Sequence, residues 1–482
     1  MARIPSITRS PGTNGGPGTP RPDGPLPLAT PLRLQPAETF DAVGVGIGPF
    51  NLSLAALLHP LELRTRFYDR APELRWHPGL MFPEATIQVS HFKDLVTLAD
   101  PTSPWSFLSF LFRHKRLYQF LNAAFPRVTR WEFEQYLRWV ADSLPEVRFG
   151  AEVRAVSLQG DTLAVDTDTE RLRTRAVVIG TGLTPAVPAC ARPHLGDAVF
   201  HAYEFLHAPR PLEGKAVAIV GGGQTGAEVV RHLLAGGARP ASLVWISRRG
   251  NFSPLDESPF ANELFTPSYS DHFYRLDGRE RGRLLDEQKL ASDGITPELL
   301  GEIYRRMYEL QHLDGVHRPC RLLPGRELVD VAGDADGVRL VVRGPRGARQ
   351  TVHADVVVLA TGAEYRLPPC LEPLAGRIPL ENGEPVVRED FSVDWDGPPE
   401  LRIYVQNAAR ARRGVPDRNL SLMAWRSALI ANSLCGRRVY DVQEPRSLVE
   451  WDGAQDSPVT GATLDERDPH LGTLSPAAVP GA

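Results

Sequence analysis

The sequence predicts an α/β protein with two parallel-sheet units, the second inserted in the first. Two observations predict the units: an apolar strand, a glycine turn and a helix follow one another at 42–58, and this order recurs at 215–234. A third observation predicts the insertion. Two short apolar runs that stop at glycine, 175–182 and 355–362, flank the second copy. Runs of this kind are typical of buried parallel strands, here at the points where the chain crosses between the units.

The first copy reads "AVGVGIGPFNLSLAALL". Gly46 permits a tight turn and Gly48 lets the backbone approach a pyrophosphate, which the positive end of the following helix attracts. The next strand ends at Asp69, about 20 residues further on, where a carboxylate can bind ribose hydroxyls. We therefore predict a dinucleotide site that includes Gly46, Gly48, Pro49, Asn51 and Asp69.

The second copy, "KAVAIVGGGQTGAEVVRHLL", has the complete Gly-x-Gly-x-x-Gly spacing. The strand after it, "SLVWISRR", ends in arginines instead of an acid. Arginine suits the 2′-phosphate of NADPH, whereas an acid favours NADH; the alternative is that these arginines are ordinary surface charge. The predicted NADPH residues are Gly221, Gly223, Gln224, Thr225, Gly226, Arg248 and Arg249.

Two such sites predict two Rossmann-like dinucleotide-binding domains, one for a bound FAD and one for the NADPH that reduces it. The four cysteines lie far apart and form no C-x-x-C pair, which disfavours disulfide reduction and a zinc cluster and fits a reduced, cytoplasmic setting. A formal net charge of −4 gives no indication of a nucleic-acid partner. No apolar run is long enough to span a membrane.

The predicted organisation starts with a Pro/Gly-rich, disordered leader. A small helical substrate region is expected beside the two domains. The predicted ranges are 1–39 for the leader, 40–205 for the first part of the FAD domain, 206–354 for the NADPH domain with substrate-binding segments, 355–442 for the second part of the FAD domain with the substrate site, and 443–482 for a flexible tail.

The segment "WHPGLMFPEATIQVSHFKDLVTLADPTSPWSFLSFL" resembles the microbial flavin-dependent N-hydroxylating monooxygenases of siderophore biosynthesis, the lysine N6- and ornithine N5-monooxygenases. The resemblance continues through 252–273, 284–304 and 419–434 and covers about residues 40 to 440. The wording "LDEQK…SDGIT" and "LSLMAWRSA" is most similar to the lysine branch, because ornithine enzymes usually carry Asn-Tyr where this chain has Asp293-Gly294.

The resemblance implies that oxygen adds to the reduced flavin to give a C4a-hydroperoxyflavin, whose distal oxygen the terminal amine of the substrate attacks. Only a neutral amine has the lone pair for this attack. A free lysine amine has a pKa near 10.4, so roughly one in a thousand is neutral at pH 7. The site must therefore desolvate the amine or take its proton, and exclude water. The implied product, N6-hydroxylysine, serves hydroxamate siderophores and hence iron acquisition.

The resemblance also implies substrate contacts. It places Lys93 on the substrate carboxylate, Asn262 on the same end, Asp293 near the α-ammonium and Ser421 near the reacting amine. Each has a plain structural alternative: an ion pair of Lys93 with its neighbour Asp94, a helix cap or turn at Asn262, a turn at Asp293, and a helix hydroxyl at Ser421.

Three further residues, Trp76, His77 and Gln88, are implied to lie at the flavin. The sequence departs from its relatives before the last motif, where they usually carry His-x-His-Gly and this chain has "ARRG" at 411–414. It also carries Asp69 where a glutamate is more common.

Lys93 and Asn262 favour an amino acid over a diamine, because a buried lysine facing a substrate without a carboxylate would be left unpaired. Ornithine and diamines such as cadaverine and putrescine stay open, since one methylene is worth only about 1–3 kcal/mol in a pocket. Two other classes are a flavoprotein reductase with a protein electron acceptor and a nucleotide-binding protein without catalysis. The resemblance further implies a homo-oligomer, often a tetramer.

Overall fold

The computed structural model describes residues 39–207, 210–236, 239–334, 337–442 and 447–451. Almost all of the predicted leader and most of the predicted tail lie outside these residues. No helix among the described residues is long and apolar enough to cross a membrane.

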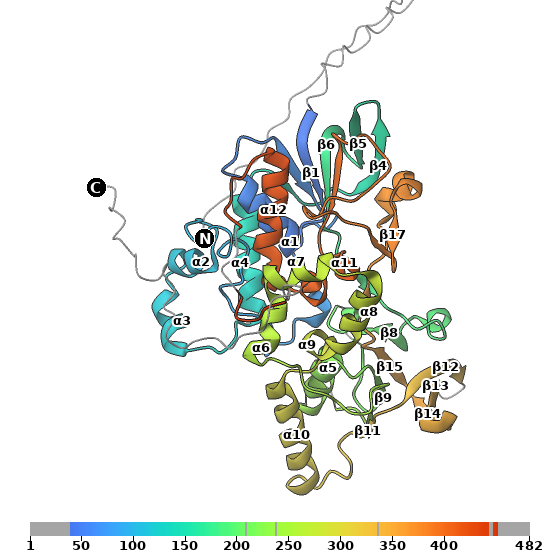
Figure 1. Ribbon diagram of the computed structural model, residues 1–482. Helices are drawn as coiled ribbons and strands as arrows, with labels where there is room; N and C mark the ends of the chain where they lie inside the picture. The colour runs from blue at the N-terminus through green and yellow to red at the C-terminus, as the bar shows by residue number, and fades with distance from the viewer. Residues whose placement is uncertain (1–38, 208–209, 237–238, 335–336, 443–446, 452–482) are drawn as a thin grey trace, which may run out of the picture. The chain divides into compact units, whose positions relative to one another are not determined.

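Among the described residues the first sheet has seven strands, of which β1, β4, β5 and β6 are labelled in Figure 1. Its order is β3-β2-β1-β6-β5-β4, and β19 also pairs with β6. The β1, β2, β3, β6 and β19 strands run parallel, whereas β4 and β5 form antiparallel ladders that continue from β6. The bounds are β1 Thr39–Val45, β2 Thr65–Tyr68, β3 Val147–Arg148, β4 Val153–Gln159, β5 Thr162–Thr167, β6 Arg171–Ile179 and β19 Arg402–Val405.

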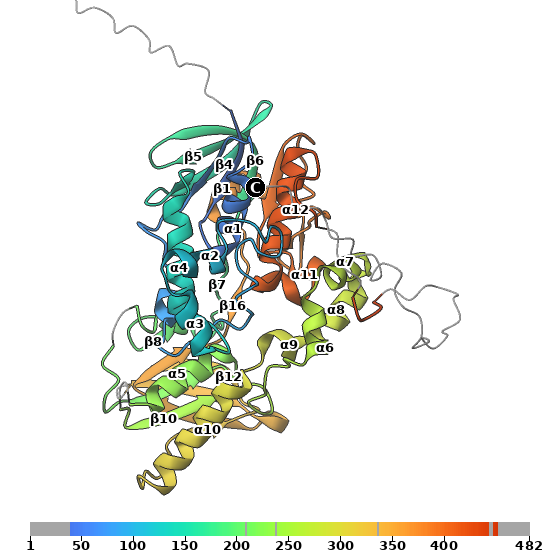
Figure 2. The same cartoon turned by 90° about the vertical axis from the view of Figure 1, so that its left-hand side faces the viewer.

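Three helices pack in the core of this sheet: α1 (Pro49–Leu58), α4 (Arg130–Ser143) and α12 (Met423–Cys435). Nearly every residue of α1 is buried, as its unbroken apolar sequence predicts. Proline at the first helical position suits a helix start because its missing N–H has no partner there in any case. In both views α12 lies beside α1 (Figures 1 and 2), so the last helix and the first cover the same side of the first sheet.

The second sheet has five parallel strands in the order β11-β10-β9-β15-β8. Helices α5 and α10 share one core cluster with it, and the antiparallel strands β12–β14 share another. The bounds are β8 Val199–His201, β9 Ala216–Val220, β10 Ser242–Ile246, β11 Arg321–Leu323, β12 Glu327–Asp334, β13 Gly337–Arg343, β14 Arg349–Ala354, β15 Val356–Leu359, α5 Gln224–Leu234 and α10 Pro297–His312.

All strands of the second sheet lie in the chain between β6 and β19 of the first. The predicted α/β class, with one parallel-sheet unit inserted in another, is therefore confirmed. The boundaries differ in detail: the predicted ranges 40–205 and 355–442 assign β8 and β15 to the first domain, but both strands pair in the second sheet. An apolar strand does not reveal by its own pattern which sheet it joins, because pairing partners are distant in the chain.

The chain crosses between the sheets twice, and the two crossings pair with each other. Strand β7 (Thr184–Pro185) forms an antiparallel ladder with β16 (Ala363–Glu364). The Thr361 hydroxyl donates to the carbonyl of Ala186 at 2.6 Å, and the amide of Ala186 donates to the carbonyl of Gly362 at 3.0 Å. The entry and exit of the inserted unit are therefore joined by hydrogen bonds.

A helical segment follows β10 and packs on the carboxyl-terminal part of the first unit. Its apolar residues, among them Tyr269 and Phe273, form one cluster with Val415. Figure 2 shows α7 and α8 beside α11 (Arg410–Arg413). The bounds of the segment are α6 Pro259–Asn262, α7 Pro267–Arg275, α8 Gly278–Glu287 and α9 Lys289–Asp293.

The other α-helices and strands of the described residues are α2 Phe107–Arg113, α3 Leu117–Ala123, β17 Leu380–Glu381 and β18 Glu384–Pro385, and short 3-10 helices lie between the elements.

Candidate active site

The first glycine turn has the geometry of an anion site. Gly46 has φ +85°, and a side-chain carbon there would come within 2.6 Å of the Gly180 carbonyl oxygen. A side-chain carbon on Gly48 would meet nothing within 4 Å. No side chain caps α1, which starts after Gly48. The first-turn amides of the helix are thus left for an external acceptor, as a pyrophosphate site requires.

Two predicted residues act on this turn itself. One carboxylate oxygen of Asp69 accepts the amide of Ile47 at 2.8 Å, so Asp69 lies at the turn as predicted. The Asn51 side chain is fully buried and donates to the carbonyls of Val45, Gly46 and Val178 at 2.8 to 3.2 Å. The Asn51 amide nitrogen therefore holds the turn in shape, and its hydrogen-bonding capacity is spent on the backbone.

Sequence reasoning missed two polar residues beside the turn, Gln406 and Asn407, which directly follow β19. The Gln406 amide donates to the Phe50 carbonyl at 3.0 Å. The side-chain oxygens of both residues are buried without a hydrogen-bond partner, as is the amide nitrogen of the predicted Gln88. Buried polar atoms are rarely left unsatisfied, so these atoms fit a bound polar molecule. In the sequence, these two residues could have been found as a polar pair that directly follows an apolar strand.

The predicted pair Trp76 and His77 lies in the segment between β2 and α2. The Trp76 amide donates to Glu134 at 2.8 Å, and its ring packs 5.2 Å from that of Phe133 on α4. His77 has φ +51° and lies 5.9 Å from the ring of Tyr203. The structure thus anchors Trp76 on α4 and turns the chain sharply at His77.

The second turn repeats the first. Gly221 has φ +136°, and a side-chain carbon there would lie 1.9 Å from the Ala360 carbonyl oxygen. One on Gly226 would lie 2.2 Å from the Gly221 carbonyl oxygen, so helix and turn are in close contact. No side chain caps α5 at Gly223. The side-chain nitrogen of Gln224 donates to the Glu228 carboxylate, and its side-chain oxygen accepts the backbone amide of Thr296. Thr225 is half-buried in the first turn of α5.

The two arginines after β10 differ. Arg249 donates to the Asp293 carbonyl at 2.7 Å and lies 3.8 Å from its carboxylate. Arg248 is exposed, and no ion pair or hydrogen bond of its guanidinium is found among the described residues. Of the two, Arg248 has the free guanidinium that a phosphate would need.

The structure brings Lys93 and Ser421 together. The Lys93 ammonium donates to the Ser421 hydroxyl at 3.0 Å, and that hydroxyl donates to Asn419 at 2.7 Å. Lys93 is half-buried, and burial lowers the pKa of its ammonium. Within the described ranges no carboxylate lies at ion-pair distance from Lys93.

The sequence neighbour Asp94 is not the partner of Lys93. Its carboxylate accepts the amides of Val96, Thr97 and Phe107 and the Thr97 hydroxyl, all at 2.6 to 2.9 Å. Asp94 therefore organises its own loop, and the alternative interpretation of a Lys93–Asp94 surface pair does not hold.

The other two predicted substrate residues lie elsewhere. Asn262 is exposed at the end of α6 and donates to the Glu257 carbonyl at 3.3 Å. Asp293 ends α9 beside the second turn, where its carbonyl would be 3.8 Å from a side-chain carbon on Gly223. No hydrogen bond or ion pair recorded for the described residues joins either side chain to Lys93 or Ser421. Of the four predicted substrate residues, Lys93 and Ser421 are therefore in contact, whereas Asn262 and Asp293 lie at two other positions.

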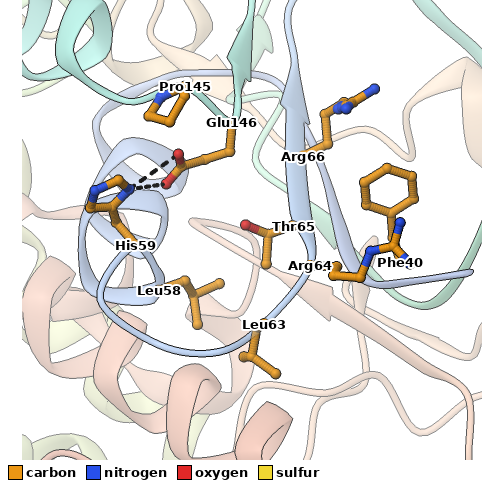
Figure 3. A pocket seen from close by; sticks show the side chains of 9 residues that line it. All are labelled: Phe40, Leu58, His59, Leu63, Arg64, Thr65, Arg66, Pro145 and Glu146. Carbon is orange, nitrogen blue, oxygen red and sulfur yellow. Dashed lines mark hydrogen bonds and ion pairs between the residues drawn. The ribbon is translucent and has the colours of Figure 1, made fainter. Parts of the chain in front are cut away.

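A hollow of about 340 Å³ lies at the other end of the first sheet (Figure 3). It is lined at the start of β1 and β2, whereas nucleotides bind at the carboxyl ends of parallel strands. Its polar groups are paired: His59 lies 3.1 Å from Glu146, and Arg66 stacks 5.0 Å from the Phe40 ring. This hollow contains none of the predicted site residues. Its lining is Phe40, Leu58, His59, Leu63, Arg64, Thr65, Arg66, Pro145 and Glu146.

Comparisons with known proteins agree with this geometry. Residues 38–366 match the family model described as L-lysine 6-monooxygenase/L-ornithine 5-monooxygenase. The L-lysine N6-monooxygenase of Escherichia coli is 39% identical over 421 residues, which are 86% of this chain and 99% of that protein. A putrescine N-hydroxylase of Acinetobacter baumannii is 31% identical over 430 residues, 87% of this chain and 95% of that protein.

Two solved structures are similar throughout. The FAD-bound cadaverine monooxygenase of the desferrioxamine pathway from Erwinia amylovora has a TM-score of 0.82 and 31% identity, and the match covers 87% of this chain and 100% of that one. An ornithine N-hydroxylase from Kutzneria sp. 744, solved with reduced FAD, NADP+ and L-ornithine, has a TM-score of 0.77 and 31% identity, with 83% and 99% covered.

Proposed function

This chain belongs to the L-lysine 6-monooxygenase/L-ornithine 5-monooxygenase family, and we propose that within this family it N-hydroxylates the terminal amine of L-lysine to N6-hydroxylysine. The family prediction made from the sequence is thereby confirmed, and with it the N-hydroxylating flavin monooxygenase chemistry of siderophore biosynthesis. The two predicted cofactors, FAD and NADPH, are those of the family.

For the cofactors, the residues at each turn support a specific placement. FAD suits the first turn, where the positive φ of Gly46 forms the tight turn, the open space at Gly48 leaves room for a pyrophosphate, and Asp69 lies at the same edge. NADPH suits the second turn, where the exposed Arg248 guanidinium has no partner among the residues that the structure describes. The reduced flavin supplies the activated oxygen when bound, and the protein contributes binding, orientation and exclusion of water.

The observation that carries the substrate proposal is Lys93. Its ammonium is half-buried, donates to a neutral hydroxyl, and faces no carboxylate among the described residues. Burying a charge without a counter-ion is costly, and a substrate carboxylate removes that cost. Lysine and ornithine carry such a group, whereas cadaverine and putrescine do not. The 39% identity to a lysine enzyme supports lysine over ornithine.

Ser421 fits this end of the substrate. Its hydroxyl lies 3.0 Å from the Lys93 ammonium and is oriented by Asn419. We therefore assign Ser421 to holding Lys93 for the carboxylate, in place of the contact with the reacting amine expected from the resemblance. The bonds between Arg249 and Asp293 favour a position for Asp293 at the NADPH turn over one at the α-ammonium. Asn262 keeps its proposed place at the carboxylate end.

The test offers L-lysine, L-ornithine, cadaverine and putrescine separately to the FAD-loaded protein with NADPH and oxygen, and measures hydroxylamine product. We expect product from L-lysine. In Lys93→Met, the KM for lysine should rise about ten- to a hundredfold, the value of one charge-assisted contact of about 1.5–3 kcal/mol, while turnover of cadaverine is unaffected. Lys115→Met, at an exposed lysine stacked on Phe112, is the matched control.

The outcomes separate the alternatives. Product from a diamine alone would reject the carboxylate assignment, and the similarity to the cadaverine enzyme makes this the second candidate. Product from ornithine alone would keep Lys93 and reject lysine. NADPH oxidation that yields only peroxide with all four amines would reject these four compounds as substrates and would leave another substrate or a reductase. Size-exclusion chromatography of the same sample tests the predicted tetramer.

A further inference from the structure

Arg413 is a buried cation at the end of α11, in the "ARRG" stretch at 411–414. Its side chain is 1% exposed, and its guanidinium lies between the rings of Tyr274 at 4.4 Å and Phe391 at 4.6 Å. We propose that Arg413 is a positioning residue that holds α7, and through it the substrate-side residue Asn262, against the flavin-side part of the first unit. This inference rests on the proposed function for the place of Asn262.

On one side Arg413 binds α7. Its Nη1 donates to the carboxylate of Asp271 at 2.7 Å, and the Ser270 hydroxyl donates to the Arg413 carbonyl at 3.4 Å. With the Tyr274 ring, three residues of α7 thus contact one arginine. The planar guanidinium can stack and donate at once, which lysine cannot do.

On the other side Arg413 binds the first unit. Its Nη2 donates to the carbonyl of Glu389. The Phe391 ring that it stacks on is shared with Arg426, which lies 4.9 Å away and also stacks 5.1 Å from Phe50. Phe50 is the second residue of α1, the helix that starts at the first glycine turn. A continuous series of contacts therefore runs from α7 through Arg413, Phe391 and Arg426 to the first glycine turn.

Asn262 is coupled to α7 through a short connection. The Thr266 hydroxyl accepts the Tyr269 amide at 3.4 Å and so caps α7, and it donates to the Glu263 carbonyl at 2.8 Å. Glu263 directly follows Asn262. Displacement of α7 therefore displaces Asn262 relative to Lys93, which belongs to a loop fixed on α1 by the Ser53 hydroxyl bonding to Leu95.

The charges allow Arg413 to be removed without leaving a lone buried ion. The Asp271 carboxylate is 49% exposed and can be solvated by water. The buried Asp417 keeps its ion pair with Arg426 at 3.0 Å. Arg413→Met and the double variant should therefore fold, and their effects report on position, whereas Asp271→Asn alone leaves the buried Arg413 guanidinium without its carboxylate partner.

The experiment compares Asp271→Asn, Arg413→Met, Arg413→Lys and the double variant D271N/R413M in the FAD-loaded protein. Hydrogen–deuterium exchange of residues 267–275 is measured without substrate. The KM for L-lysine and the hydroxylated product per NADPH oxidised are measured with it. The control is Arg366→Met. It breaks an exposed ion pair with Glu364 that takes no part in the contacts of α7 described above.

In D271N and R413M we expect the hydrogen–deuterium exchange rate of residues 267–275 and the KM for lysine each to rise about tenfold, as for loss of one charge-assisted hydrogen bond. The amount of hydroxylated product per NADPH oxidised should fall. The rate of flavin reduction by NADPH should stay unchanged. The double variant should be no worse than R413M, because both changes remove one contact, and R413K should recover part of the loss.

Unchanged exchange in 267–275 would overturn the proposal. So would faster exchange with an unchanged KM and unchanged coupling, since the contact would then serve stability alone. The exchange measurement needs no substrate. A wild-type protein that hydroxylates no lysine would therefore reject the proposed function, while exchange in 267–275 still decides whether Arg413 and Asp271 hold α7.

Discussion

The two glycine turns share one backbone design and differ in charge. At each, a glycine with positive φ packs on the backbone that follows the neighbouring parallel strand: Gly46 on Gly180 after β6, and Gly221 on Ala360 after β15. Each is followed by a helix that no side chain caps. The residues after the next strand are Asp69 in one case and two arginines in the other. The backbone geometry of the turn therefore occurs twice, and the charge of the side chains after the next strand distinguishes the two turns.

The turns also differ in their surroundings. The first unit holds a cation without an acidic partner among the described residues, Lys93, whereas Arg249 at the second turn has Asp293. An unpaired cation is open to a ligand and a paired one is already neutralised. From this contrast we propose that Lys93 and Arg248 bind ligands and that Arg249 serves local structure.

The largest effect should come from valine at the turn glycines. Gly46→Val and Gly221→Val each place a side chain in backbone at positive φ, at a cost on the order of 3 kcal/mol or more with the clash. We expect G46V to purify without FAD and G221V to keep FAD but lose reduction by NADPH. Flavin absorbance per protein and stopped-flow reduction measure this.

Gly376→Ala, at an exposed glycine with open space around it, should change neither quantity. Loss of FAD from G221V with retention in G46V would reverse the assignment of the two turns.

The next effect sharpens the contrast between the arginines. In Arg248→Ala the KM for NADPH should rise about ten- to a hundredfold through loss of a charge-assisted phosphate contact, while the KM for NADH stays constant. Arg249→Ala should affect both coenzymes alike, since Arg249 holds Asp293. Steady-state kinetics with both coenzymes measure the difference. An equal change for NADPH and NADH in R248A would contradict a 2′-phosphate contact.

The third prediction concerns pH. Burial lowers the pKa of Lys93, and the protonated form is the one that binds a carboxylate. Binding is therefore complete below that pKa and is lost as pH rises through it, by up to about tenfold per pH unit. The ratio of the KM for lysine to that for cadaverine should rise at alkaline pH, because the terminal amines of both substrates titrate alike and cancel. A ratio independent of pH, or one that falls, would exclude Lys93 as the carboxylate partner.

The smallest effect should follow Asp293→Asn. The ion pair with Arg249 spans 3.8 Å and both side chains are partly exposed, so its contribution is about 0.2–1 kcal/mol and screened by salt. We expect the KM for NADPH to change by about two- to fourfold at low salt, and the KM for lysine to stay unchanged. A selective rise in the KM for lysine would return Asp293 to the substrate.

The sequence predicts what depends on local geometry. The glycines at both turns, the strands before them and the acid or arginine after them follow from short spacings, and the structure has each element there. The sequence does not predict which polar side-chain atoms form hydrogen bonds within the folded protein. Asn51 reads as a cofactor contact, but one of its acceptors is the carbonyl of Val178, 127 positions away.

The site shows the same limit. Lys93 and Ser421 are 328 positions apart, so their contact is a property of the fold. The resemblance indicated both residues but assigned them to opposite ends of the substrate. Arg413 could not be assigned at all, since its partner Asp271 is 142 positions away and the arginine-rich stretch is typical of solvated surface.

The ladder between β7 and β16 brings the two ends of the inserted second unit together. Thr184 and Glu364 are cross-strand partners, so the two ends of the insertion lie about 5 Å apart. Where the two ends of an inserted unit lie this close, a two-residue hairpin turn is long enough to join the strands directly. Closing so short a loop costs little conformational entropy. The second sheet and its glycine turn are therefore encoded by one continuous piece of gene, together with helices α6 to α9 that pack on the first unit.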